Sequence, residues 1–142
     1  MASKAILDLA QKRDAHLDER LRTEIIIWLA TVRPDGRPHL VPVWFLWDSS
    51  ESVIYIFSKP DQKIRNLKEN PNVVLALNSP TGNDVVTLEG TATLLERHVI
   101  STAHPDYEAK YKSLLDSYNW TGESMSRSYS EPIRIEITKV RA

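Results

Sequence analysis

The residues with the clearest capacity for chemistry lie in segment 58–67, which reads SKPDQKIRNL. The segment follows the apolar run 53–57, so we expect a strand that leads into the first turn of a short helix. One hydroxyl and three cations gather at this junction: Ser58, Lys59, Lys63 and Arg65. A helix N-terminus offers unpaired N–H groups and a partial positive charge, and both suit a phosphate. The segment therefore predicts a site for a phosphate-bearing cofactor, and an ordinary solvated helix start is the alternative.

Other catalytic patterns are absent from the sequence. The chain has no cysteine, which excludes disulfides, thiolate metal sites and a cysteine nucleophile. Its four histidines show no metal-site spacing, so we expect no metal, and its four glycines build neither of the usual phosphate loops. Because no acid, base or nucleophile stands out, chemistry would have to come from a bound cofactor that the protein orients.

Composition indicates one soluble globular domain, residues 1–142. Apolar residues make up 42% of the chain and charged residues 26%, which is ordinary for such a protein. A net charge of −1 provides no broad basic surface for nucleic acid or an anionic membrane. Charged residues interrupt the N-terminal segment, and the longest apolar run, 25–30, is far too short to span a bilayer. We therefore expect a cytoplasmic protein.

Short strands dominate the expected elements. We expect six of them, at residues 25–32, 39–47, 53–57, 73–77, 85–96 and 133–137. The turn 33–37 contains Pro34 and an Asp-Gly pair, so it should close a hairpin between the first two strands. Strand 39–47 is apolar on both faces and needs a barrel core on one side and a partner chain or ligand on the other. Gly90 indicates a bulge or a barrel corner.

Three helices complete the expected fold. Segment 4–21 spaces Ile6, Leu9, Leu17 and Leu21 along one face, segment 61–69 ends before an Asn-Pro pair, and segment 99–118 begins its main part at Pro105. The combination predicts a small closed β-barrel in an α+β domain.

The order of these segments resembles the pyridoxamine 5'-phosphate oxidase-like split-barrel flavoproteins, including their branch that uses the deazaflavin F420. The likeness is carried by LATVRPDGRPH at 29–39, VWF at 43–45, KIRNLKENP at 63–71 and EGTA at 89–92. The resemblance implies a mainly β, α+β fold: a six-stranded antiparallel split barrel of Greek-key type with flanking helices. It also implies a homodimer that binds FMN or F420 at the subunit interface.

The resemblance further implies which residues contact the cofactor. Lys63 corresponds to a lysine that binds the cofactor phosphate, and Arg65 and Asn66 match positions in the same turn. Three residues match the strand end beside the cofactor, Ile56, Phe57 and Ser58. The second strand would line the ring with its backbone at Val41, Pro42, Val43 and Trp44. Lys59 is either a further phosphate contact or a solvated side chain.

The two tryptophans of strand 39–47 and a third farther along carry separate expectations. Trp44 and Trp47 are three residues apart and should face opposite sides of the strand, with Trp47 either in the core or at the dimer interface. Trp44 either packs in the core or an interface, or contacts the ring. Trp120 lies in a polar segment and could reach a cofactor across the dimer.

One departure from the family bears on activity. Where the oxidases proper have an arginine directly before the lysine, this chain has Gln62. The resemblance therefore implies an FMN- or F420-dependent oxidoreductase that transfers hydride to or from a small molecule, rather than a true pyridoxamine phosphate oxidase. A flavin- or haem-binding carrier without specific turnover is the alternative function.

Overall fold

The computed structural model describes residues 5–97 and 105–142. In this part of the chain the strands are β1 Ile26–Val32, β2 Pro38–Trp44, β3 Leu46–Asp48, β4 Val53–Ser58, β5 Asn72–Ala76, β6 Thr87–Leu94 and β7 Glu131–Arg141. The helices are α1 Lys12–Thr23, α2 Gln62–Glu69, α4 Pro105–Ser117 and α5 Gly122–Ser128.

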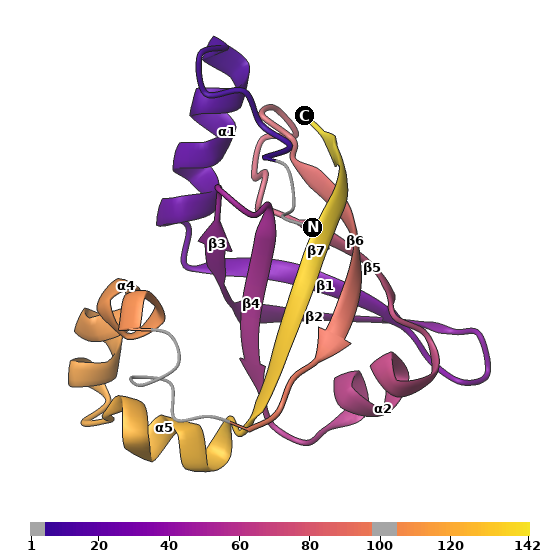
Figure 1. Ribbon diagram of the computed structural model, residues 1–142, viewed down its shortest axis with the longest axis vertical. Coiled ribbons are helices and arrows are strands. Elements are labelled where there is room, and N and C mark those ends of the chain that lie inside the picture. Colours follow the sequence, from indigo (N-terminus) through magenta and orange to yellow (C-terminus); the bar gives the residue numbers. More distant parts are fainter. Residues whose placement is uncertain (1–4, 98–104) are drawn as a thin grey trace.

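The strands form one curled antiparallel sheet in the order β2-β1-β5-β6-β7-β4-β3. Figure 1 shows α4 and α5 together on one side of this sheet and α2 on the other. The arrangement confirms the predicted class, a mainly β split barrel with flanking helices. The expected closed barrel is wrong, because β2 and β3 are the two edges of the curled sheet and, among the described residues, do not pair with each other. Among the described residues, none of the helices is long and apolar enough to cross a membrane.

The predicted hairpin between the first two strands is confirmed. Val32 pairs with Pro38, and the N–H of Arg33 donates to the carbonyl of Arg37 across the turn. Gly36 adopts a φ of 89°, which side chains rarely tolerate, so the Asp-Gly pair supplies the residue that the turn requires.

The predicted single strand 39–47 is wrong, because it divides into two strands at Phe45. β2 ends just before this residue at one edge of the sheet, and β3 begins just after it and pairs with β4 at the other edge. The Phe45 N–H donates to the hydroxyl of Tyr111 at 2.8 Å, and its carbonyl accepts from the Lys110 ammonium at 2.8 Å. Side chains of α4 therefore bond the backbone of Phe45 where a neighbouring strand would otherwise do so. Because of this break, the described sheet has seven strands instead of the predicted six.

Gly90 lies at the irregularity that the sequence predicted. The register between β6 and β7 shifts between Glu89 and Gly90. A side-chain Cβ at Gly90 would stand 2.7 Å from the backbone oxygen of Glu136. The close approach of β7 therefore requires glycine here.

The barrel interior is filled by aliphatic side chains from alternating strand positions, together with Leu17 and Leu21 of α1. Trp47 lies in this core, which is one of its two predicted places, and its indole N–H donates to the buried carboxylate of Asp18 at 2.8 Å. Asp18 also accepts from Arg22, so its charge is paired. The indole N–H, the only polar group of the Trp47 side chain, therefore has a hydrogen-bond partner.

The predicted helix 4–21 is too long at its start, since α1 begins only at Lys12. Leu9 is 51% exposed and does not join an apolar helix face. The N–H of Ile6 donates to Ser52, and the Asp8 carboxylate accepts from the N–H of Ala10. The bond to Asp8 is local and competes with helix formation, and the bond to Ser52 ties segment 5–11 to a residue far away in sequence.

The C-terminal half contains one confirmed helix start and one missed helix. α4 begins at Pro105 as expected, whereas segment 99–104 of that prediction lies outside the described residues. α5 was not predicted, although Thr121 and Ser124 form a reciprocal capping box at its start.

Candidate functional site

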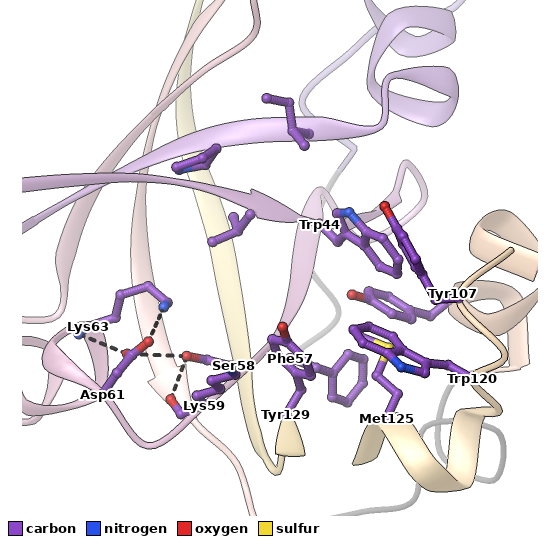
Figure 2. A pocket seen from close by; sticks show the side chains of 14 residues that line it. Trp44, Phe57, Ser58, Lys59, Asp61, Lys63, Tyr107, Trp120, Met125 and Tyr129 are labelled. Atoms are coloured by element: carbon purple, nitrogen blue, oxygen red, sulfur yellow. Dashed lines mark hydrogen bonds and ion pairs between the residues drawn. The ribbon is translucent and has the colours of Figure 1, made fainter. Parts of the chain in front are cut away.

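A cavity of about 520 Å³ lies between the ends of β2 and β4, the start of α2, and the helices α4 and α5. Figure 2 shows its polar side chains on one side and its aromatic side chains on the other. We call the first group the polar end: Ser58, Lys59, Asp61 and Lys63. We call the second group the aromatic end: Trp44, Phe57, Tyr107, Tyr118, Trp120, Met125 and Tyr129. Ile26, Pro42 and Val43 complete the wall.

The polar end is built by the passage from β4 into α2. Asp61 is the N-cap residue of α2, and its Oδ1 accepts from the backbone N–H of Lys63 at 3.2 Å. Its Oδ2 lies 2.7 Å from the Lys63 ammonium. The Ser58 hydroxyl donates to the Lys59 carbonyl at 2.7 Å. This short segment therefore places a hydroxyl, two ammonium groups and one carboxylate on the cavity.

The expected helix start also contains a carboxylate, which was not among the predicted site residues. A carboxylate already caps α2 and pairs with Lys63, because Asp is a favoured N-cap residue. The Lys63 side chain is 10% exposed and that of Asp61 is 40% exposed. A ligand anion therefore meets a lysine that has an internal partner.

The structure brings most of the predicted site residues to one cavity. Those that line it are Pro42, Val43, Trp44, Phe57, Ser58, Lys59, Lys63 and Trp120. The Lys59 ammonium stands 5.3 Å from the ring centroid of Tyr129, in the range of a cation–π contact. Trp120 lines the cavity within its own chain.

Four predicted site residues lie outside the cavity wall. Val41 is half-buried on β2 and Ile56 is fully buried in the barrel core. The Arg65 guanidinium donates to the side chain of Gln62 at 2.8 Å and is exposed. Asn66 is fully buried and donates to the Thr31 hydroxyl at 2.9 Å, so it ties α2 to β1.

Gln62, the departure from the family pattern, also bonds within α2. Its amide nitrogen donates to the Asn66 side chain at 2.7 Å, and its oxygen accepts from Arg65. Gln62 does not line the cavity.

Stacked and edge-on ring contacts build the aromatic end. Trp44 stacks on Tyr111 with ring centroids 4.4 Å apart and planes 2° from parallel. Tyr107 meets Phe57 edge-on at 4.7 Å, and Trp120 lies 5.2 Å from Tyr118. The first two contacts join the ends of β2 and β4 to α4, and the third packs two rings of the segment before α5 against each other.

Two buried tyrosines one helical turn apart differ in their hydroxyls. The Tyr111 hydroxyl accepts from the Phe45 N–H and lies 2.7 Å from the Ile25 carbonyl, to which it can donate. Tyr107 is equally buried, yet its hydroxyl has no hydrogen-bond partner among the described residues. Burial raises the pKa of both phenols, that of Tyr107 with a smaller contribution from Tyr111, so both stay protonated at neutral pH.

Lys110 is a half-buried titratable group of α4. Its ammonium lies 3.8 Å from the ring centroid of Phe45 and donates to the Phe45 carbonyl. Burial lowers the pKa of Lys110 to about 8, although Glu24 acts in the opposite direction. This lysine contacts the wall behind Trp44 and does not line the cavity.

Several residues that line the cavity were not predicted from the sequence. They are Ile26, Asp61, Tyr107, Tyr118, Met125 and Tyr129. Asp61 could have been found as the N-cap that follows Pro60. The capping box at Thr121 could have announced α5, which brings Met125 to the cavity. Within residues 5–97 and 105–142, no group of three or more His, Cys, Asp or Glu side chains is arranged to hold a metal ion.

Comparison with known proteins yields one family and several related folds. Residues 14–142 match the family model described as pyridoxamine 5'-phosphate oxidase. A solved F420 reductase is 26% identical, with a TM-score of 0.64 over 87% of this chain and 94% of that one. An FAD-binding protein from Mesorhizobium loti is 20% identical, with a TM-score of 0.63 and coverage of 89% and 88%. The heme storage protein of Vibrio cholerae is 16% identical, with a TM-score of 0.65 and coverage of 93% and 95%. The last two are similar in fold.

Proposed function

The chain belongs to the pyridoxamine 5'-phosphate oxidase family, and from that premise we propose that it is an oxidoreductase that binds FMN or F420. The reaction would be hydride transfer between this cofactor and a small unsaturated molecule. The similarity to an F420 reductase supports the deazaflavin branch. The lack of cysteine fits a cytoplasmic location, which stays a prediction.

The observation that carries the proposal is that the polar end and the aromatic end share one cavity. A volume of about 520 Å³ falls within the range of pockets for small molecules and cofactors. Two lysines are donors that suit a phosphate, while the Ser58 hydroxyl beside them donates to the Lys59 carbonyl. The Trp44 ring and the adjoining β2 backbone offer a flat apolar surface beside them. The donor set and the wall thus fit a cofactor with a phosphate and a planar ring.

Each part of the wall has a distinct task in this proposal. Lys63 and Lys59 would hold the phosphate, and Pro42, Val43 and Trp44 would orient the ring. The half-exposed Trp120 would limit access of water to the reacting face. The bound cofactor supplies the hydride chemistry, since no paired acid and base line the described wall. We expect no true pyridoxamine phosphate oxidase activity, because Gln62 stands where the oxidases proper have an arginine. Its side chain bonds within α2.

We further propose that the working unit is a homodimer. On the outer face of the sheet, Leu40 lies opposite Ala30, which lies opposite Val74. Leu40 is 62% exposed and Val74 is 45% exposed. The next row pairs Trp28 with Pro42, which lines the cavity, so a second copy on this face would reach the site. Light scattering should give twice the chain mass of 16.2 kDa, and a monomer that binds cofactor would contradict the dimer.

Titration of the purified protein with FMN and with F420, side by side, tests the cofactor. We expect Lys63→Ala to weaken binding of the preferred cofactor by about tenfold or more, since charge-assisted hydrogen bonds to phosphate are strong. Arg65→Ala is the matched control, because it removes a cation of the same helix that bonds Gln62 and does not line the cavity. Equal affinities of wild type and Lys63→Ala would contradict the assignment of Lys63, and binding of neither cofactor would overturn the proposal.

A carrier without specific turnover is the second candidate, and the fold shared with a heme storage protein favours testing it. No histidine lines the described cavity, so an imidazole ligand for haem iron would have to come from elsewhere. A Soret band after haem titration, with no flavin or deazaflavin binding, would favour a haem carrier. Bound flavin or F420 that reduces no compound in a broad acceptor screen would favour a cofactor carrier.

A further inference from the structure

The polar end of the cavity contains a carboxylate that faces its own phosphate-binding lysine. The Lys63 ammonium lies 2.7 Å from Asp61 Oδ2, and both residues line the cavity. Lys63 is nearly enclosed, whereas the Asp61 side chain is partly open to the cavity and solvent. An incoming phosphate must therefore bind Lys63 together with Asp61, or displace the Asp61 carboxylate from the Lys63 ammonium.

The charges of the polar end add up to a single positive charge. Lys59 and Lys63 contribute two cations and Asp61 one anion, so the sum is +1. Arg65 does not add to it, because its guanidinium is exposed and bonds Gln62. The described wall contains no other charged side chain.

Phosphates of different esters carry different charges. A phosphate monoester such as that of FMN carries about −1.5 to −2 at neutral pH, because its second pKa is about 6. A phosphodiester has no second ionisable oxygen and carries a single charge. The single excess cation of the polar end matches the diester, while the second charge of a monoester would lie close to the Asp61 carboxylate. Like charges at such separations repel, the more so when water is partly excluded.

We propose that Asp61 sets which phosphate the cavity accepts, and that it selects a singly charged phosphodiester over a doubly charged monoester. The inference rests on the proposed function, since it takes the polar end to be the cofactor-phosphate site. FMN is a monoester, whereas F420 joins its phosphate to a second group as a diester. Asp61 therefore favours a cofactor of the F420 type.

The competing explanation is that Asp61 only caps α2. Asparagine caps helices about as well as aspartate, so Asp61→Asn keeps the cap and removes the charge. Asp61→Ser is a second neutral capping variant, in case the first does not fold. Asp35→Asn is the matched control, because it removes the same charge from the exposed turn between β1 and β2, far from the cavity wall.

The experiment titrates each protein with three ligands that share one ring: riboflavin, FMN and the methyl ester of FMN, which is a phosphodiester. If only the deazaflavin ring binds, the same three forms of that ring are used. We expect wild type to bind the diester about fivefold or more tighter than the monoester, given the extra like-charge contact. Asp61→Asn should raise monoester affinity by about tenfold and change the unphosphorylated ligand by less than about twofold. Asp35→Asn should leave the monoester-to-diester ratio unchanged.

The outcomes separate the two claims. Binding of the unphosphorylated ring with the same monoester-to-diester ratio in wild type and Asp61→Asn would overturn the role of Asp61 and leave the proposed function standing. A weaker monoester affinity in Asp61→Asn would overturn it as well. Failure of every flavin and deazaflavin ligand to bind wild type would overturn the proposed function, and the role of Asp61 with it.

Discussion

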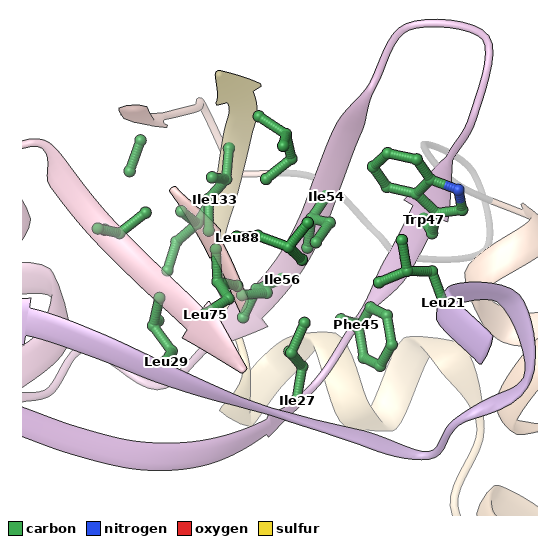
Figure 3. Close-up of a cluster of buried hydrophobic side chains, with 14 of the residues drawn as sticks. Leu21, Ile27, Leu29, Phe45, Trp47, Ile54, Ile56, Leu75, Leu88 and Ile133 are labelled. Carbon is green, nitrogen blue, oxygen red and sulfur yellow. The ribbon is translucent and has the colours of Figure 1, made fainter. Parts of the chain in front are cut away.

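The barrel core and the aromatic cluster beside α4 differ in composition and in how their polar groups are paired. The barrel core is almost entirely aliphatic, with Ile27, Ile54, Leu75 and Ile133 at its centre, as Figure 3 shows. The aromatic cluster consists of Phe57, Tyr107, Tyr111, Leu115 and Met125, with Trp44 and Tyr129 packed against it. The barrel core is enclosed by strands, whereas Phe57, Tyr107 and Met125 also face the cavity.

The barrel core and the aromatic cluster also differ in whether their buried polar groups have hydrogen-bond partners. In the barrel core the Trp47 indole N–H has a partner in Asp18. In the aromatic cluster the Tyr107 hydroxyl has none among the described residues. A buried hydroxyl without a hydrogen-bond partner lowers the stability of a protein. The polar group of the barrel core therefore favours stability, whereas the Tyr107 hydroxyl of the aromatic cluster does not.

The largest effect is expected in the barrel core. Ile54→Ala should lower the free energy of unfolding by about 2–5 kcal/mol, because it removes a fully enclosed side chain and leaves a cavity. Urea unfolding followed by circular dichroism measures this loss. Cofactor affinity at low temperature should stay near that of wild type. A loss below about 1 kcal/mol would show that the core repacks and is less rigid than described.

Tyr111→Phe should have the next largest effect. It leaves the buried N–H of Phe45 without its acceptor, which costs about 1–3 kcal/mol. The same urea titration measures the change. An unchanged stability would mean that another group, such as a water molecule, replaces the hydroxyl.

Tyr107→Phe should act in the opposite direction. Removing a buried hydroxyl that lacks a described partner should raise the stability by up to about 1 kcal/mol, seen as a higher Tm. The two substitutions delete the same atom one helical turn apart, so each controls for the other. Equal losses in both would erase the contrast between satisfied and unsatisfied groups in the aromatic cluster.

The last effect concerns pH. The folded-state pKa of Lys110 is lowered from 10.5 to about 8, so between these values the unfolded chain binds more protons than the folded one. This group therefore makes stability rise with pH above 8. The rise should be absent in Lys110→Met, which keeps the apolar stem over the Phe45 ring. Unfolding of both proteins should be compared between pH 8 and 9.5, and parallel curves would contradict the shift.

Local signals predicted much of the fold. The turn around Gly36, the bounds of α2 and the irregularity at Gly90 each depend on residues that are adjacent in sequence or on one glycine. The break at Phe45 could not be predicted in this way, because its hydrogen-bond partner Tyr111 is 66 residues away. Tertiary partners of this kind override strand patterns.

The sequence predicted that the lysines and the end of β2 would lie at the candidate site. It did not predict that a carboxylate would pair with one of these lysines. The cationic pattern around Lys63 is visible in the sequence, whereas the ion pair with Asp61 depends on side-chain geometry. Tyr107 resembles any other helical residue in sequence, and its unpaired hydroxyl emerges only from packing. Asn66 was predicted to contact the cofactor because it matches a family position in the same turn as Lys63, and in the structure its buried side chain donates to Thr31.

The position of β7 in the sheet has a consequence for how the chain folds during synthesis. β7 is the last described strand in sequence, yet it lies between β6 and β4. Until residues 131–141 leave the ribosome, β4 and β6 each present an unpaired edge, and the sheet exists only as two separate pieces. Such edges invite pairing with other nascent chains. Folding of this domain should therefore complete after translation of β7, and chaperone binding before that point would protect the two open edges.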